Sequence, residues 1–129
     1  MAWMDKITVL YVSPYELPKV KKISNTLKSM QKLVNGNIEV SYLLHDDKVC
    51  IICNEEGKFN GSSPNRVIDK DIIYDSFLIV GDDIENGDFK SLTKAQIEKY
   101  SAWFNEDSIA RLQSKLTARK IAHAIVYRR

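Results

Sequence analysis

The polar loop at residues 53–66, CNEEGKFNGSSPNR, carries the side chains best suited to binding chemistry. Its acids accept hydrogen bonds, its bases donate them, and its asparagine amides do both. Its two glycines allow backbone conformations that other residues avoid. A simple turn needs only about two to five residues. We therefore expect a surface that binds a ligand or partner through Asn54, Glu55, Glu56, Lys58, Asn60, Asn65 and Arg66.

Arg66 is the central residue of this expectation, as an exposed guanidinium that pairs with a phosphate or carboxylate in bidentate fashion. The alternative is a loop that satisfies only itself, with asparagine side chains bonded to their own backbone. In that case Arg66 would hold the loop together by pairing with Glu55 or Glu56. Both interpretations stay open at the level of the sequence.

Patterns typical of catalysis are sparse. His45 falls in an expected hairpin turn and His123 on a basic helix, and neither has a triad or metal-ligand spacing around it. We predict no catalytic residue, no metal site and no cofactor, and an enzyme is the less favoured class. The enzymatic alternative is nucleotide chemistry with Glu55 or Glu56 as the base.

Cys50 and Cys53 form a C-x-x-C pattern, which in other contexts is typical of redox or zinc sites. Here both lie in KVCIIC, a β-branched run that indicates a buried strand. Residues three apart in a strand point to opposite faces. We therefore expect two buried, structural thiols.

The periodicity of the chain predicts one α+β domain over residues 1–129. We expect a mostly antiparallel sheet, with one helix after the first hairpin and two C-terminal helices packed on it. Strands are expected at 6–12, 19–23, 38–44 and 48–53, with another within 71–81 centred on 77–80, and helices at about 25–35, 93–104 and 109–127.

The expected helix ends have recognisable signals. Ser24 or Asn25 is expected to cap the first helix, and Gly36 to end it. Thr93 and Gln96 have the spacing of a capping box. In the last helix, apolar side chains are expected to contact the sheet along the whole length: Ile109, Leu112, Leu116, Ala118, Ile121 and Ile125.

Charge is unevenly distributed along the chain. The net charge is +2, yet residues 110–129 hold six bases and no acid. Arg111, Lys115 and Arg119 stand at i, i+4 and i+8, which predicts a basic stripe on a helix. The stripe suits nucleic-acid phosphates or an acidic partner, and the alternative is a solvated helix face. Residues 69–88 hold seven acids and one base, too short a segment to imitate duplex DNA.

Hydropathy sets the expected location. No apolar run approaches the roughly 18–20 residues that cross a bilayer, and the first residues lack the features of a secretory signal. We expect a cytoplasmic protein that makes no membrane contact. Two apolar faces on the long last helix are compatible with an oligomer.

The segments ICNEEGKFNG, PNR, FLIVG and DFKSLTKAQIEKY resemble a domain-of-unknown-function family of small proteins from phages and conjugative elements of Gram-positive bacteria. In that family the loop reads Asn-Glu-Glu-Gly-Lys, then Gly, then Pro-x-Asn-Arg. The resemblance covers roughly residues 7–104, and Ser62-Ser63-Pro64 departs modestly from it. The basic helix at about 107–127 lies outside the resemblance.

The resemblance implies a setting more than a reaction. It implies a non-enzymatic binding protein of a mobile genetic element, acting in the bacterial host as a counter-defence factor. Such a factor sequesters a small nucleotide signal or blocks a host defence protein. The alternative is a nucleic-acid-associated accessory protein of phage or element regulation or transfer, acting through the basic C-terminal helix.

Overall fold

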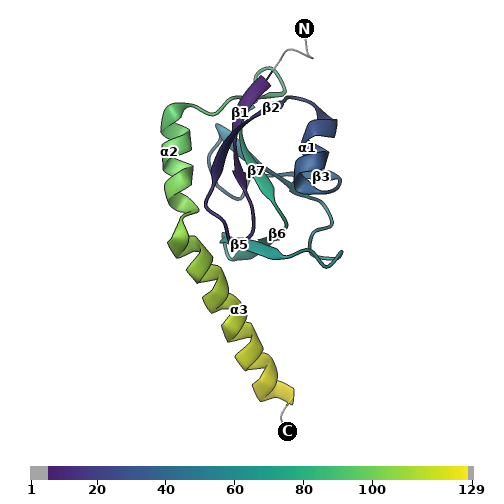
Figure 1. Cartoon of the computed structure of the whole chain (residues 1–129), viewed down its shortest axis with the longest axis vertical. Helices are drawn as coiled ribbons and strands as arrows, with labels where there is room; N and C mark the ends of the chain where they lie inside the picture. The colour runs from purple at the N-terminus through teal and green to yellow at the C-terminus, as the bar shows by residue number, and fades with distance from the viewer. Residues whose placement is uncertain (1–5, 128–129) are drawn as a thin grey trace.

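The computed structural model describes the backbone of residues 6–127 and the side chains of residues 6–121. A six-stranded antiparallel sheet forms the centre of the molecule (Figure 1). The strand order is β2-β1-β7-β4-β3, and β8 pairs with the far part of β7. The strands are β1 (Lys6–Val12), β2 (Lys19–Ser24), β3 (Ile38–Ser41), β4 (Val49–Asn54), β7 (Phe77–Asp83) and β8 (Asp88–Lys90).

Both faces of the sheet are covered, and this explains its apolar central strands. On one face, α1 (Leu27–Val34) packs Met30 and Val34 against the sheet. On the other face, α2 (Lys94–Trp103) contributes Tyr100, and Phe104 at its C-cap joins the same core. Every residue of β4 is buried, because β4 lies between these two layers.

A separate hairpin, β5 (Pro64–Ile68) and β6 (Asp71–Tyr74), lies at one end of the sheet, beside the start of α3 (Glu106–Tyr127) (Figure 1). Its two-residue connection, Asp69 and Lys70, has positive φ at both positions (48° and 69°). In a type I′ turn, which is common in two-residue hairpin loops, both loop residues have positive φ, and Asn-Gly is the usual sequence.

The predicted α+β class and its antiparallel main sheet are confirmed, whereas the separate two-stranded sheet of β5 and β6 was not predicted. The capping box is also confirmed, since Thr93 Oγ1 accepts from Gln96 N at 3.1 Å and Gln96 Oε1 accepts from Thr93 N at 2.8 Å. The sequence did not predict β5, β6 and β8, and the strand expected over 38–44 ends at Ser41.

The ends of α1 differ from the prediction by one or two residues. Thr26 is the N-cap, because its hydroxyl accepts a hydrogen bond from Ser29 N at 3.2 Å. Asn35 takes the left-handed conformation at the C-terminus, with φ of 65°, in place of Gly36. Asparagine tolerates this conformation better than most residues, so the glycine is not needed for it.

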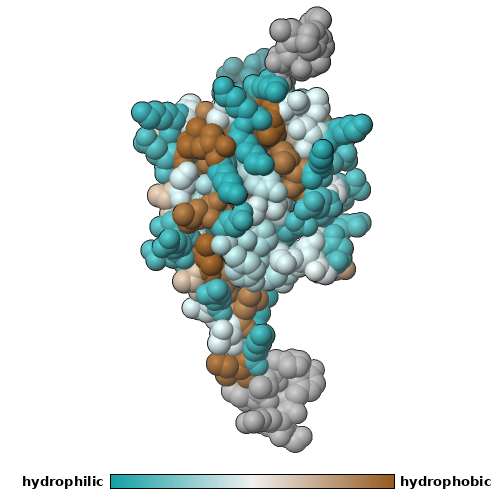
Figure 2. Space-filling model, in the orientation of Figure 1, coloured by the Kyte–Doolittle hydropathy of each residue, from teal (hydrophilic) through white to brown (hydrophobic). Residues whose placement is uncertain are grey.

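The last helix packs on the domain over its first part only. Leu112 is fully buried, but Ala118 and Ile121 are exposed, Ile121 by 57%. The inward contact predicted for these two residues is wrong, because α3 projects past the edge of the domain (Figure 1). Figure 2 shows apolar side chains in a band alongside α2 and onto α3. Ile125 and His123 lie outside the described side chains.

Both cysteines are free and buried, as predicted, and they belong to different core clusters. Cys50 faces the α1 side of the sheet and Cys53 the α2 side. Burial raises the pKa of Cys50 to about 12 and that of Cys53 to about 11. The two thiols therefore stay protonated at neutral pH. Because they lie on opposite faces of the sheet, they point away from each other.

Candidate functional site

Arg66 lies in the interior of the molecule, on β5, with no exposed surface. Its Nη2 donates to the backbone oxygens of Glu16 at 2.5 Å and Phe104 at 3.3 Å. Its Nε donates to Ser108 Oγ, in the first turn of α3, at 2.8 Å. Burial lowers the pKa of Arg66 to about 10, so the guanidinium stays charged at neutral pH, surrounded by carbonyl dipoles.

These contacts contradict both expectations for Arg66. The side chain does not face a ligand, and it makes no bond with Glu55 or Glu56 among the interactions of the described residues. The physical reason is β5, which starts at Pro64 and directs Arg66 away from the loop toward the α2–α3 junction. Arg66 is a structural residue that fixes the position of that junction.

Asn54 and Asn65 are also buried, and both amides are engaged in the fold. Asn54 Nδ2 donates to the backbone oxygens of Val34 at 3.0 Å and Asn35 at 3.2 Å. These carbonyls lie at the end of α1, where the helix itself supplies no donor. Asn65 Nδ2 donates to Val12 O, on β1, at 2.9 Å. The two amides thus join the loop ends to the sheet and to α1.

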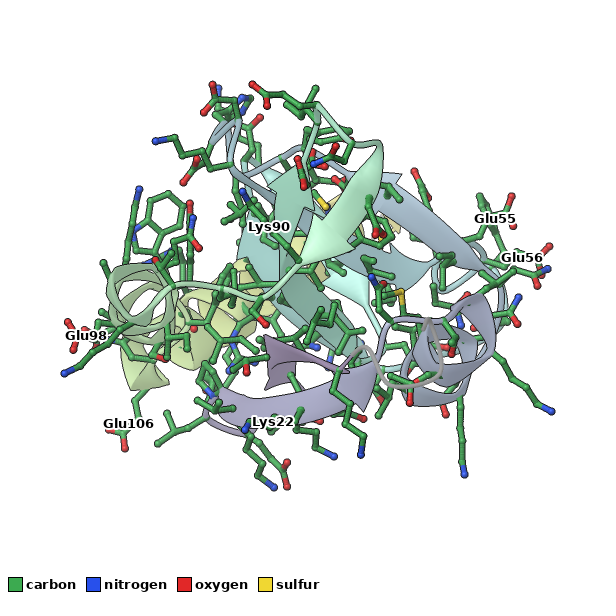
Figure 3. All side chains as sticks on the ribbon, turned by 90° about the horizontal axis from the view of Figure 1, so that it is seen from above. Lys22, Glu55, Glu56, Lys90, Glu98 and Glu106 are labelled. Carbon is green, nitrogen blue, oxygen red and sulfur yellow. The ribbon has the colours of Figure 1, made fainter. Side chains whose placement is uncertain are left out.

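The other predicted loop residues stay on the surface. Figure 3 shows Glu55 and Glu56 pointing outward, at the edge of the molecule opposite α2. Lys58 Nζ pairs with Asp71 Oδ1 at 2.6 Å, with both side chains about half exposed. Asn60 Oδ1 accepts a hydrogen bond from the backbone two residues on, at 3.1 Å. A binding role for these four exposed residues remains a prediction.

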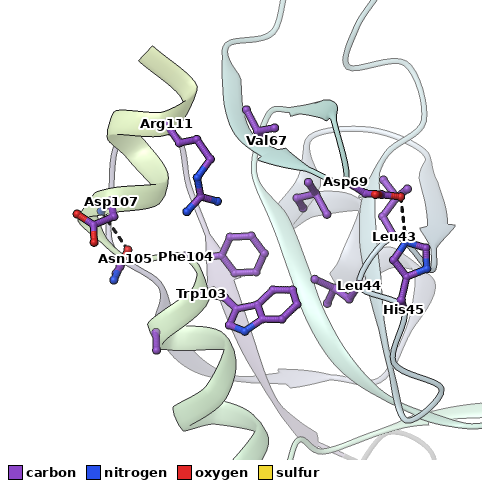
Figure 4. Close-up of a pocket in the computed structure, with 12 residues that line it drawn as sticks. Leu43, Leu44, His45, Val67, Asp69, Trp103, Phe104, Asn105, Asp107 and Arg111 are labelled. Atoms are coloured by element: carbon purple, nitrogen blue, oxygen red, sulfur yellow. Dashed lines mark hydrogen bonds and ion pairs between the residues drawn. The ribbon is translucent and has the colours of Figure 1, made fainter. Parts of the chain in front are cut away.

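A pocket of about 500 Å³ lies where three segments of the chain meet (Figure 4). Its walls are residues 43–45 before β4, residues 67–69 at the end of β5, and residues 102–105 with Asp107 and Arg111 at the α2–α3 junction. Small-molecule sites commonly have volumes of about 300–1,000 Å³. The pocket therefore has the size of a small-ligand site. Arg66 donates a hydrogen bond to the backbone oxygen of Phe104, which lines the pocket.

Trp103 presents an indole ring at this pocket and is 47% exposed. Tyr100 packs against it edge to face, with the ring centroids 5.3 Å apart, and Lys99 Nζ lies 5.8 Å from the indole centroid. Tyr100 Oη also donates to Asp46 Oδ2 at 2.6 Å, which ties α2 to the segment before β4. These contacts hold the indole as a flat surface for stacking.

Arg111 supplies a cation to the same pocket. In Figure 4 its side chain reaches from α3 toward the space above Phe104. Arg111 is exposed and forms no ion pair with another side chain that the structure describes. A planar guanidinium in this state can pair with a phosphate or carboxylate through two parallel hydrogen bonds.

His45 and Asp69 complete the pocket on the side opposite Arg111 (Figure 4). His45 Nε2 lies 2.9 Å from Asp69 Oδ2. Both residues have left-handed backbone conformations, with φ of 55° and 48°. Such conformations cost about 1–2 kcal/mol for residues other than glycine. The fold therefore keeps two unfavourable backbone positions where these side chains meet.

The predicted basic stripe divides into three environments. Arg111 lines the pocket, whereas Lys115 is partly buried and its Nζ donates to Lys70 O in the β5–β6 turn at 2.7 Å. Arg119 is exposed, on the part of α3 that has left the domain. Only Arg111 of the three belongs to a concave site.

Sequence reasoning missed Trp103 and Asp69 and gave His45 no role. His45 and Asp69 are 24 residues apart, and no local spacing predicts that a turn and a hairpin tip meet. Trp103 had a usable signal, because it lies outside the apolar face formed by Ile97, Tyr100 and Phe104. A large aromatic residue off the buried face of a helix is a candidate for ligand contact.

Two further observations concern metals and membranes. Within residues 6–121, no three His, Cys, Asp or Glu side chains gather as a metal ion would require. Among the helices that the structure describes, none has both the length and the apolar composition needed to cross a membrane.

The fold and the site define an α+β domain with a pocket of about 500 Å³ at the junction of its two C-terminal helices. The chain belongs to the family described as the domain of unknown function DUF3846, whose profile matches residues 7–105. The match ends where α3 begins, so Trp103 lies inside the family region and Arg111 outside it. No curated protein and no solved structure matches the chain.

Proposed function

We propose that this chain is a non-enzymatic binding protein of a mobile genetic element from a Gram-positive bacterium. It acts in the host cytoplasm as a counter-defence factor and captures a small nucleotide signal in the pocket at the α2–α3 junction. In the other form of this proposal, the same surface blocks a host defence protein. The observation that carries the proposal is the meeting in one pocket of an exposed indole and an exposed guanidinium that has no ion pair among the described side chains.

The groups of the pocket match the parts of a nucleotide. A base stacks on Trp103, and base–aromatic stacking contributes about 1–3 kcal/mol per base. A phosphate pairs with Arg111. The carboxylates of Asp69 and Asp107, at the rim, accept hydrogen bonds from ribose hydroxyls or an exocyclic amine. His45 stays on the Asp69 side of the pocket and orients that carboxylate.

The proposal is tested by fluorescence titration with mononucleotides and cyclic dinucleotides. The chain has two tryptophans, so a Trp3→Phe background leaves Trp103 as the sole reporter in the pocket. We expect saturable quenching by at least one nucleotide class. Mass spectrometry after incubation should return that nucleotide unchanged, and a converted product would contradict a non-enzymatic role.

Arg111→Ala should weaken nucleotide binding by roughly 10- to 100-fold, because a charge-assisted hydrogen bond contributes about 1.5–3 kcal/mol. Arg111→Lys should recover part of the affinity, since an ammonium lacks the planar fork. Arg119→Ala is the matched control, because it removes the same charge from the same helix outside the pocket. Equal losses in Arg111→Ala and Arg119→Ala would argue against a pocket ligand.

A second function follows from the projection of α3 beyond the domain (Figure 1). The alternative proposal is a nucleic-acid-associated accessory protein that lays the basic side of α3 along phosphates. Binding of duplex DNA should then fall linearly in log–log form with salt, at a slope set by the number of phosphates contacted. Capture of one nucleotide has a far smaller salt dependence, so the salt slope separates the two proposals.

A further inference from the structure

A second pocket, of about 340 Å³, lies on the other side of the sheet from the α2–α3 junction. Asp82 on β7 stands opposite Phe89 on β8 in the strand register, and both line this pocket. Phe89 also packs against the core cluster that contains Met30 of α1. The pocket therefore opens on the α1 side of the sheet, yet no residue of α1 lines it.

One oxygen of the Asp82 carboxylate has no partner among the described residues. Its Oδ2 is buried and accepts no hydrogen bond from any residue that the structure describes, and the side chain forms no ion pair within that part of the chain. The neighbouring phenol of Tyr42 and thiol of Cys50 are neutral at pH 7. Burial and then the charge of Asp82 raise the pKa of Tyr42, with a smaller contribution from a hydrogen bond between the Tyr42 hydroxyl and the Asp82 carboxylate. Burial and then the charge of Asp82 raise the pKa of Cys50 to about 12. A buried carboxylate oxygen without a hydrogen-bond partner is costly and requires an explanation.

The walls of the pocket are apolar and aromatic. Tyr42 is 56% exposed, Val40 and Ile84 are also exposed, and Phe89 lines the same pocket. The surrounding segment 82–88 adds three more acids and no base. Aromatic faces attract cations within about 6 Å of the ring centroid. An aromatic pocket with a carboxylate at its base thus selects a cation that also has apolar surface.

We propose that this pocket binds an arginine side chain of a partner protein. The guanidinium stacks on the Tyr42 ring and lies against the Asp82 carboxylate, which supplies the missing balance of charge. The exposed side chains of Val40 and Ile84 provide apolar surface for the residues that flank the arginine. Arginine anchored in an aromatic pocket is a common centre of binding energy in protein interfaces. The site does not depend on the ligand of the α2–α3 pocket.

The proposal is tested by NMR titration of the ¹⁵N-labelled protein with N-acetyl-L-arginine amide. We expect saturable shifts of the backbone amides of Tyr42, Asp82 and Phe89. N-acetyl-L-citrulline amide has nearly the same shape without the charge, and it should bind about tenfold more weakly. Equal binding of the two compounds, or shifts that spread over the whole surface without saturation, would overturn the proposal.

Matched variants separate the pocket from general charge effects. Asp82→Asn should weaken arginine binding about tenfold, whereas Asp83→Asn removes the same charge one residue away and should leave it unchanged. Asp83 bonds to Asn86 Nδ2 at 2.8 Å and does not line the pocket. Equal losses in both variants would overturn the proposal. Tyr42→Ala removes an exposed wall of the pocket and should also lower the affinity for arginine. This variant tests the proposal if Asp82→Asn does not fold. Unchanged arginine binding in Tyr42→Ala would refute the site.

Discussion

Arg66 shows how a residue with binding chemistry becomes part of the framework. The guanidinium joins three segments, since its bonds reach Glu16 in the β1–β2 connection, Phe104 at the end of α2 and Ser108 in α3. A buried arginine without a carboxylate is stable only when carbonyl and hydroxyl oxygens surround it. Its influence on the pocket is therefore indirect, through the position of the α2–α3 junction.

Arg66→Met should lower the free energy of unfolding by about 3 kcal/mol or more. The buried carbonyl oxygen of Phe104 and the buried hydroxyl oxygen of Ser108 lose their donor, as does the partly buried carbonyl of Glu16. Each buried group left without a partner costs about 1–3 kcal/mol. Urea denaturation followed by circular dichroism measures the change. Lys58→Ala is the control, because its ion pair with Asp71 is about half exposed and contributes at most about 1 kcal/mol. Similar small losses in both variants would contradict the framework role.

At the scale of elements, α3 has a first part that packs on the domain and a second part that is exposed. The first three turns contact β5 and carry Ser108 and Leu112, which are buried. From Thr117 to Ile121 every described side chain is exposed. The first part therefore belongs to the domain and completes the pocket, while the second part extends the helix away from it.

Truncation after Thr117 should leave the melting temperature nearly unchanged, because the removed described side chains are exposed. Truncation after Phe104 should lower it strongly, since Leu112 leaves the core and Arg66 loses Ser108 Oγ. Thermal melts by circular dichroism compare the two fragments with the full chain. A cooperative melt of the 1–104 fragment at the full-length temperature would show that α3 adds nothing to the domain.

At the scale of the whole molecule, the stability of the fold depends on pH through carboxyl groups whose pKa changes on folding. Asp46 is the clearest case, because hydrogen bonds from Tyr100 Oη and then from Lys48 N hold its pKa below the usual 3.8. A carboxyl whose pKa is lowered by folding stabilises the fold above its unfolded pKa, and this contribution disappears as pH falls through the folded value. Acid should therefore weaken the tie between α2 and the segment before β4.

Tyr100→Phe removes the donor to Asp46 and should cost roughly 1.5–3 kcal/mol of unfolding free energy at pH 7. The difference from the unsubstituted chain should shrink as pH falls from 3.8 through the lower folded pKa of Asp46, because the carboxyl then becomes protonated in the folded protein as well. Urea denaturation at pH 7 and at pH 3 measures it. A difference that is the same at both pH values would mean that the Asp46 charge does not contribute.

The sequence by itself determined the elements whose signals are local. The capping box of Thr93 and Gln96, the opposed Cys50 and Cys53 and the antiparallel α+β class all follow from spacing within a few residues. The sequence did not predict the short strands of the β5–β6 hairpin, because Pro64 and the turn residues around these strands are equally typical of a loop.

Only the tertiary structure decided which polar residues line a pocket. Arg66 and Asn65 have the composition of a binding loop, but long-range contacts turn them inward. His45, Asp69, Trp103 and Arg111 come together from a turn, a hairpin tip and a helix junction. The physical reason is that local interactions select secondary structure, whereas burial depends on how distant elements pack.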